Sequence, residues 1–408
     1  MKGFGRQVTI SGDGTYVVAL EQFPVSVNPQ GGSAGKIHTF RREVAIIDDG
    51  VKDLYVVTYQ IINTIVLPDV HEAHLFPMVG SLEITPDGNH LVVGMVNNGT
   101  TGEVRVYSLR RSSNTWIQKG STITGGSDAI GMGAISSDGK TVLVAGPNAY
   151  ARGIRVAKVF RWTQPDPSIT PDWEQIGSNI YEPVGGSQRL THFCTELDIS
   201  DDGDVIALSA QGYNEHGWVQ VYERNTTTND YEVKGAAFEG AIHSELLGST
   251  LALSPDGNRI AIADQKLGSG NDSCKVYDWN GASWIQKGNS IPRSILEENK
   301  DRQNLQSSNP HLHFSGCDDI LILGDGYSLE SNHSGLVRVF KLTGENWVEH
   351  FSMEGVEKDI FGSGYTVGHW GDSACISRTG FYVGSKKFGR TLVFGHGIHN
   401  SVHAAHRK

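Results

Sequence analysis

The sequence predicts an all-β protein built from one repeated unit, and two observations carry that prediction. The first is composition: 50 of the 408 residues are glycine and 19% are charged, which is typical of a turn-rich globular chain and not of a disordered or coiled-coil one. The second is a short pattern, an apolar run followed by Asp-Gly and a β-branched run, that recurs along the whole chain. No helical periodicity of useful length separates the copies.

Each copy of this pattern predicts a β-hairpin. Glycine adopts a positive φ without steric cost, and aspartate bonds the backbone amides of a turn. Five copies are clear and the last two are degenerate. The copies cover residues 8–19, 81–94, 134–146, 197–208, 251–263, 312–324 and 374–384.

Two further strands are expected after most hairpins. A Val-x-Val-Tyr type of segment predicts a third strand, as at residues 102–107, 217–222, 274–277 and 335–340. An outer strand that starts with Trp follows at residues 116–120, 173–177, 284–288 and 347–350, and Tyr231 takes the place of Trp in another copy. Because these Trp residues recur at one position, we expect them to cover a blade face at its wetter rim; the alternative is stacking on a sugar.

Four antiparallel strands repeated seven times predict one seven-bladed β-propeller of four-stranded blades, because radial closure leaves only short, protected sheet edges. We expect the blades at residues 4–78, 79–130, 131–193, 194–247, 248–307, 308–361 and 362–408. The last blade is short, so either the C-terminal tail supplies its outer strand or it keeps three strands. The first blade is complete in itself, so no strand exchange between the termini is expected.

The repeat unit resembles the FG-GAP, integrin-α-like propeller repeats, in the divergent form that marine bacterial, algal and large-virus proteins carry. The residues behind this resemblance are the Ser-x-Asp-Gly turns, the Val-x-Val-Tyr strands and the Trp-x-Gln-x-Gly segments. Phe-Gly at residues 361–362 and Ala-Gly-Pro at residues 145–147 are similar to the FG and GAP elements for which the family is named. The resemblance covers nearly the whole chain. It implies a propeller used as a recognition surface or scaffold, and it is less specific for function than for fold.

The negative net charge of the chain disfavours two classes of partner. The chain has 34 Lys and Arg against 45 Asp and Glu, for a net charge of −11. Such a balance disfavours binding to nucleic acid or to anionic lipid. No apolar stretch approaches the ~18 residues that span a bilayer, and residues 1–5 show no signal-peptide pattern.

Linear motifs for catalysis are absent, so we predict no catalytic residue, no cofactor and no metal. The four cysteines have no ligand spacing and are expected as small buried residues. One carboxylate per tight turn cannot enclose calcium, which wants six to eight oxygen ligands; the denser group at residues 201–204 leaves that question open. His396, His399, His403 and His406 are read as a polar tail, and His311 and His313 as a pair on one side of a strand.

These observations favour a non-enzymatic interaction or structural module, a rigid scaffold in a larger assembly such as a virion or a cell-surface complex. Its longest loops, residues 21–36, 164–172, 181–192, 291–309 and 326–334, would contact a protein or glycan partner. The candidate binding residues in these loops are Arg189, His192, Arg293, Arg302 and Tyr327. The alternative is a lectin or a glycan-active hydrolase in the central channel, which would need a pair of carboxylates facing that channel.

Overall fold

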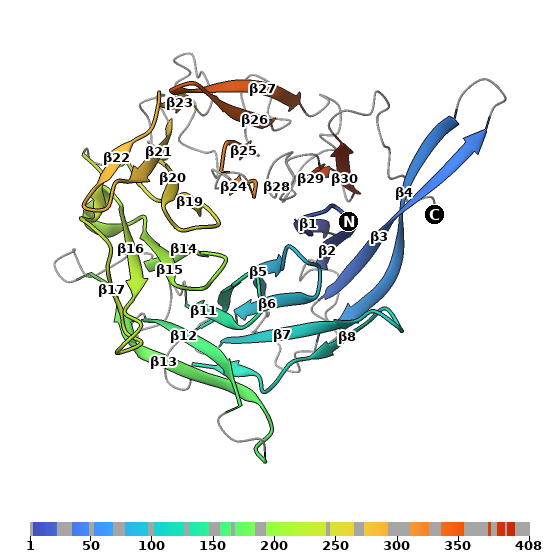
Figure 1. Cartoon of the computed structure of the whole chain (residues 1–408), viewed down its shortest axis with the longest axis horizontal. Helices are drawn as coiled ribbons and strands as arrows, with labels where there is room; N and C mark the ends of the chain where they lie inside the picture. The colour runs from blue at the N-terminus through green and yellow to red at the C-terminus, as the bar shows by residue number, and fades with distance from the viewer. Residues whose placement is uncertain are drawn as a thin grey trace, which may run out of the picture.

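The strands of the chain form blades around a common axis, as a computed structural model shows (Figure 1). The structure describes residues 3–22, 35–48, 53–67, 78–96, 102–125, 130–146, 156–164, 168–183, 193–241, 245–264, 273–292, 311–316, 318–325, 336–354, 374–376, 382–387 and 390–395. All regular elements in these residues are strands except one short 3₁₀ helix, η2 (Tyr213–Glu215). None of the described residues belongs to a helix long and apolar enough to cross a membrane.

Within each blade the strands run antiparallel, outward from the axis in chain order. The first two blades contain β1 (Gly3–Ile10), β2 (Tyr16–Gln22), β3 (Gly35–Asp48) and β4 (Asp53–Val66), and then β5 (Met78–Ile84), β6 (His90–Val96), β7 (Gly102–Arg110), β8 (Thr115–Gln118) and β9 (Ile123–Thr124). The third and fourth contain β10 (Met132–Ile135), β11 (Thr141–Ala145), β12 (Val156–Thr163) and β13 (Asp172–Tyr181), and then β14 (Phe193–Ile199), β15 (Val205–Ala210), β16 (Trp218–Arg224), β17 (Tyr231–Val233) and β18 (Phe238–Glu239). The fifth and sixth contain β19 (Thr250–Leu253), β20 (Arg259–Ala263), β21 (Ser273–Trp279), β22 (Trp284–Gln286) and β23 (Ile291–Pro292), and then β24 (His311–Phe314), β25 (Ile320–Asp325), β26 (Leu336–Thr343) and β27 (Asn346–Glu354). The remaining sheet contains β28 (Ala374–Ile376), β29 (Tyr382–Lys387) and β30 (Arg390–Gly395).

The predicted all-β propeller of four-stranded antiparallel blades is confirmed, but the predicted number of such blades is wrong. Six sheets hold the four-strand unit, not seven, and the sheet of β28, β29 and β30 has three strands among the described residues. The prediction overcounted because the hairpin signal of the last copy is present while its outer-strand signal is missing. Hairpin chemistry is local to a few residues, whereas a fourth strand needs its own apolar segment.

The first and last sheets meet by packing and do not share a strand. The described part of β1 pairs only with β2 within its sheet, and β1 contacts β28, β29 and β30. The innermost strands β1, β5, β10, β14, β19, β24 and β28 each contact the next in this series, and β28 contacts β1. The expected absence of strand exchange therefore holds for the described strands.

The Asp-Gly turns owe their shape to a repeated hydrogen-bond pattern. In the fifth blade the Ser254 hydroxyl donates to Asp256 Oδ1 at 2.6 Å, and the backbone N–H groups of Asn258 and Arg259 donate to Asp256 Oδ1 and Ser254 Oγ at 2.9 and 2.8 Å. Gly257 has a φ of +65°, and a Cβ there would lie 2.5 Å from the Cβ of Val205. The interpretation of these aspartates as turn formers is confirmed.

The outer-strand Trp residues join neighbouring blades. Trp173 Nε1 donates to the carbonyl oxygen of Lys119 at 2.8 Å, and Trp284 Nε1 donates to that of Lys234 at 2.8 Å. Trp347 follows the same pattern toward the fifth blade and is 3% exposed. These contacts confirm a structural role for the Trp positions.

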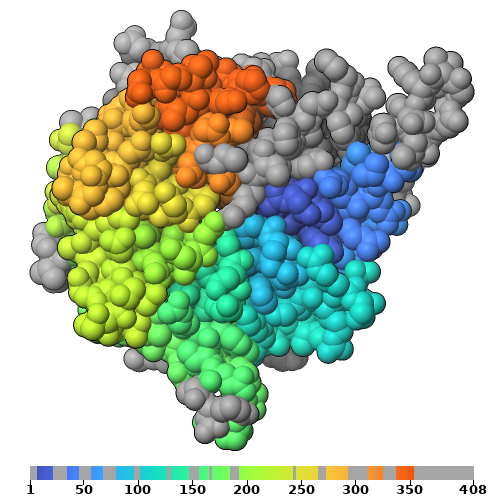
Figure 2. Space-filling model, viewed as in Figure 1, coloured from blue at the N-terminus to red at the C-terminus, as the bar shows by residue number. Residues whose placement is uncertain are grey.

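Apolar cores lie between successive blades, which Figure 2 shows side by side around the axis. Val92 and Val104 of the second blade pack in one cluster with Val142 and Val144 of the third. Cys194 and Cys274 are buried, as expected; the side chains of the other two cysteines lie outside the described residues. Packing between blades, and not within them, therefore holds the innermost strands at fixed positions about the axis.

Candidate functional site

The innermost strand of each sheet carries one residue at an equivalent register position, two residues before the Ser or Thr that begins the turn. In β5 this residue is Glu83, paired with Val92, and in β14 it is Asp198, paired with Ala207. We call the set the axial ring: Thr9, Glu83, Ala134, Asp198, Ala252, His313 and Cys375. One position of the repeat is thus apolar in some blades and ionisable in others.

Polar side chains of the axial ring reach to the next blade. The N–H of Ile84 donates to Thr9 Oγ1 at 3.2 Å, and the N–H of Ile135 donates to Glu83 Oε2 at 3.2 Å. The N–H of Leu253 donates to Asp198 Oδ2 at 2.7 Å. Each donor comes from the innermost strand of the following blade, so these side chains are held in place around the axis.

Glu83, Glu196 and Asp198 form a cluster that we call the axial carboxylates. Burial, with a contribution from the charge of Asp198, raises the pKa of Glu83 and of Glu196 to about 8. Burial raises the pKa of Asp198 to about 6, although the N–H groups of Leu253 and Ile199 favour its charged form. Protein surrounds all three side chains, yet each stays partly exposed. Water therefore reaches carboxylates that belong to two different blades and interact electrostatically.

A β-bulge shapes the strand that carries two of these groups. In β14 the pairing shifts between Phe193, opposite Ala210, and Leu197, opposite Leu208. Cys194 within this interval has a φ of +59°, an uncommon conformation for a residue with a side chain. The backbone N–H of Glu196 leaves the regular ladder and donates to Ser209 Oγ at 3.1 Å. Bulges of this kind re-aim side chains and are frequent beside active sites.

His313 occupies the axial-ring position of the sixth blade. Its Nδ1 lies 2.7 Å from the carbonyl oxygen of Phe314, so Nδ1 carries the proton of that hydrogen bond. Desolvation by the protein around the axis lowers the pKa of His313, although the side chain is exposed and the bond to Phe314 favours the charged ring. The ring is therefore neutral at pH 7, and its Nε2 keeps a lone pair. His313 is two blades from Asp198 around the ring, the same step that separates Asp198 from Glu83.

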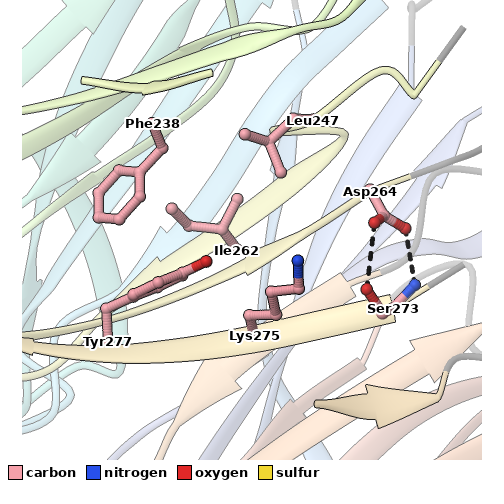
Figure 3. Close-up of a pocket in the computed structure, with 7 residues that line it drawn as sticks. All are labelled: Phe238, Leu247, Ile262, Asp264, Ser273, Lys275 and Tyr277. Atoms are coloured by element: carbon pink, nitrogen blue, oxygen red, sulfur yellow. Dashed lines mark hydrogen bonds between the residues drawn. The ribbon is translucent and has the colours of Figure 1, made fainter. Parts of the chain in front are cut away.

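A small cavity away from the axial carboxylates is too small to be a substrate site. It lies between the fourth and fifth blades and is lined by Phe238, Leu247, Ile262, Asp264, Ser273, Lys275 and Tyr277 (Figure 3). Its volume of about 10 Å³ holds about one water molecule. Asp264 accepts hydrogen bonds there from the N–H and the hydroxyl of Ser273, at 2.6 and 3.1 Å. This cavity has no room for a substrate.

The five predicted binding residues, Arg189, His192, Arg293, Arg302 and Tyr327, all lie outside the described residues, as do the four histidines of the C-terminal tail. Among the described residues, no group of three or more His, Cys, Asp or Glu is arranged to hold a metal ion. The aspartates at residues 201–204 are occupied by the fold. Asp202 accepts from Ser200 and from the N–H of Asp204, and Asp204 pairs with Arg224 at 2.7 Å.

The axial carboxylates are not among the residues predicted from the sequence, although the repeat carries a signal for them. Glu83 and Asp198 interrupt the apolar first strand of their copies, at a column where other copies hold Ala134 or Ala252. Comparing the seven copies column by column would have marked this position. Catalytic motifs are defined by spacing along the chain, whereas this site is spread over separate blades, so no such motif marks it.

Comparison with known proteins identifies the architecture. No family model matches the chain, so the resemblance to FG-GAP repeats stays a prediction, and no curated protein matches it. Three of the solved structures that resemble this chain span most of it. A periplasmic gluconolactonase of Pseudomonas aeruginosa, PpgL, is 14% identical, with a TM-score of 0.51 over 86% of this chain and 85% of its own. A Bacteroides uniformis protein assigned as a 6-phosphogluconolactonase is 14% identical, with a TM-score of 0.50 over 86% of each chain.

A third similar structure is Chaetomium thermophilum Sqt1 bound to the N-terminus of ribosomal protein L10, which is 14% identical with a TM-score of 0.52 over 95% of this chain and 83% of that one. At such identities the likeness establishes the propeller fold. The prediction of a non-enzymatic interaction module is nevertheless contradicted, because the similar structures include lactone hydrolases. It inferred the absence of catalysis from the absence of linear motifs, an inference that fails where single residues from separate blades meet at one axis.

Proposed function

We propose that this chain is a hydrolase that opens a sugar-derived lactone at its axial carboxylates. One observation carries the proposal: Glu196 and Asp198 lie two residues apart on β14, and their pKa values are raised to different levels, about 8 and about 6. Near pH 7 one group is mostly protonated and the other mostly ionised. Paired groups whose environments separate their pKa values are the mark of an acid and a base.

Asp198 is the base. Two backbone N–H groups, those of Ile199 at 2.8 Å and Leu253 at 2.7 Å, fix its carboxylate and leave further lone pairs. The carboxylate takes a proton from water as the water oxygen bonds to the lactone carbonyl carbon. A tetrahedral intermediate with one negative charge on the former carbonyl oxygen results.

Glu196 is the acid. Its carboxyl group makes no hydrogen bond with a described residue, so its proton is available to a ligand. When the intermediate collapses, the bond between the carbonyl carbon and the ring oxygen breaks and Glu196 donates its proton to that oxygen. The product is an open-chain hydroxy acid. Proton exchange with water then returns Asp198 to its ionised form and Glu196 to its neutral form.

The charge of the site favours a neutral substrate. With Glu83 and Glu196 mostly protonated, Asp198 brings about one negative charge to the axis near pH 7. Within the described chain, neither the axial ring nor the residues two positions before it include Lys or Arg. A phosphate group on the substrate would therefore have no cationic side chain to pair with at these two positions of the innermost strands. The choice of a lactone follows the names of two similar propellers, and we extend it to this chain as part of the proposal.

The experiment is proton release in a pH-stat with D-glucono-1,5-lactone, corrected for spontaneous hydrolysis. We expect Asp198→Asn and Glu196→Gln to lower kcat/KM by about 10²–10⁴, the usual contribution of a general acid or base. Asp202→Asn is the matched control, because it removes a carboxylate from a turn of the same blade and keeps the acceptor oxygen for Ser200. No turnover above background by the folded wild-type chain, or equal losses in the control, would refute the proposal.

A further inference from the structure

A second group of side chains capable of chemistry lies on the first blade, away from the axis. Glu21 of β2, His38 of β3 and Thr64 of β4 are connected across three adjacent strands. His38 Nε2 lies 3.0 Å from Glu21 Oε2, and His38 Nδ1 lies 3.0 Å from Thr64 Oγ1. The strand register explains the alignment, since His38 stands opposite both Ala19 and Thr64. The three groups form a continuous hydroxyl–imidazole–carboxylate series.

The hydrogen bonds of this series have a defined direction. A carboxylate only accepts, so the bond to Glu21 places the proton of a neutral imidazole on His38 Nε2. Nδ1 then carries the lone pair and must accept, so the Thr64 hydroxyl donates its proton toward the ring. This is the arrangement in which an imidazole acts as general base on a hydroxyl.

The burial of the three residues also suits this chemistry. The side chains of His38 and Glu21 are 13% and 11% exposed, so protein shields the hydrogen bond between them from solvent. Thr64 is exposed on β4, the outermost strand of its blade. Among the described strands β4 pairs only with β3, so alternate N–H groups along it point away from β3. A reagent can thus approach the hydroxyl from solvent and meet backbone N–H donors beside it.

Comparison among blades sets His38 apart. The equivalent position of the third strand is held in the other sheets by Arg105, Lys158, Gln220, Lys275, Arg338 and Leu392. None of these side chains acts as a general base near neutral pH in its ordinary state. The fold therefore does not require an imidazole here, and among the described sheets only the first blade has one at this register position, beside a buried carboxylate and an exposed hydroxyl.

We propose that Thr64, His38 and Glu21 form a second, nucleophilic site that accepts an acyl group from small uncharged esters. His38 Nδ1 takes the Thr64 proton as Oγ1 bonds to the ester carbonyl carbon. The bond from that carbon to the leaving alkoxide breaks, and the alkoxide takes the proton from His38. Water then hydrolyses the threonine ester by the same route and restores the hydroxyl.

The test uses an uncharged fluorophosphonate probe on the full chain, with the modified residue mapped by peptide mass spectrometry. The phosphorus–oxygen bond forms at Thr64 as fluoride leaves. We expect modification at Thr64, its loss in Thr64→Val, and a rate about 10²-fold lower in His38→Gln, the size of a general-base effect. Thr64→Ser should react at least as fast as the wild type.

Thr58→Val is the matched control, because Thr58 is also exposed on β4 but stands opposite Glu43 and not a histidine. Thermal melting checks that each variant is folded. Absence of label from Thr64 in the folded wild type, or an unchanged rate in folded His38→Gln, would overturn the proposal. Glu196→Gln should label as fast as the wild type, so this result stands apart from the fate of the axial hydrolase.

Discussion

The strands β10 and β14 occupy the same place in adjacent blades and differ in what they present to the axis. β10 carries Met132 and Ala134, and its pairing with β11 has no register shift. β14 carries Glu196 and Asp198 at the corresponding positions, and its pairing with β15 contains the bulge at Cys194. Both strands end in the same serine-aspartate-glycine turn.

This difference shows how a repeated scaffold acquires a site. The turn and the apolar residues that face neighbouring blades are nearly constant, so packing holds every innermost strand alike. The axial-ring position holds alanine in β10 and a carboxylate in β14, and the carboxylate costs stability through its own burial. The following predictions alter this comparison, beginning with the largest expected effect.

The strongest change makes β14 resemble β10. The variant Glu196→Met with Asp198→Ala removes both the proposed acid and the proposed base, so we expect lactone turnover to fall by at least about 10³. The same variant should be more stable than the wild type near pH 8, because two buried ionisable groups are gone. Urea denaturation alongside the pH-stat assay separates the two effects. A variant that loses activity through misfolding would instead be less stable.

The next effect is the pH dependence of stability. The axial carboxylates have folded-state pKa values of about 8, 8 and 6, above their ordinary values of 4.5 and 3.8, so the folded state holds protons that the unfolded state releases. Their contribution to the free energy of unfolding is therefore greatest below about pH 4 and is lost as the pH rises toward 8. We expect the double variant to lose less stability than the wild type over this range.

The turn aspartates serve as an internal contrast. Burial alone would raise the pKa of Asp13 and of Asp256, but hydrogen bonds from neighbouring hydroxyl, amide and N–H groups lower it below 3.8. Their contribution is present above that value and is lost as the pH falls further. Urea denaturation of the wild type and of the double variant from pH 3 to pH 8 tests whether the axial carboxylates and the turn aspartates change stability over different pH ranges. Parallel curves for the wild type and the double variant would contradict the assigned axial pKa values.

The smallest effect concerns the degenerate turn of the sixth blade. Asp318 stands where other copies have glycine, with a φ of +60°, and its Oδ1 is buried without a hydrogen-bond partner. Burial, and next the charge of Asp256, raises its pKa to about 6, although Arg259 opposes the shift. We expect Asp318→Gly to raise the free energy of unfolding by about 1 kcal/mol, more at pH 8 than at pH 4. Equal or lower stability in urea denaturation would contradict this account.

Much of the fold follows from residues close together in the sequence. Ser254, Asp256 and Gly257 specify a turn through hydrogen bonds that span five residues, and the Trp that follows the third strand lies in an outer strand, as Trp284 does in the fifth blade. Seven four-stranded blades were one too many: the last copy has a hairpin but no such Trp, and its sheet has three strands among the described residues. The binding residues predicted in the loops, because loops often carry function, lie outside the described residues and stay a prediction. The axial carboxylates, which the structure brings together, lie on the innermost strands.

The sequence alone determined the repeated strand–turn–strand unit, its turn chemistry and the radial architecture, because each depends on contacts within one copy or between adjacent copies. Only the tertiary structure decided that Glu83 and Asp198, from blades separated by another blade, share one electrostatic environment. Ring closure sets that proximity, and no local pattern records it. Likewise, the link from Thr64 through His38 to Glu21 exists because three strands pair in one register, which places their side chains on the same face.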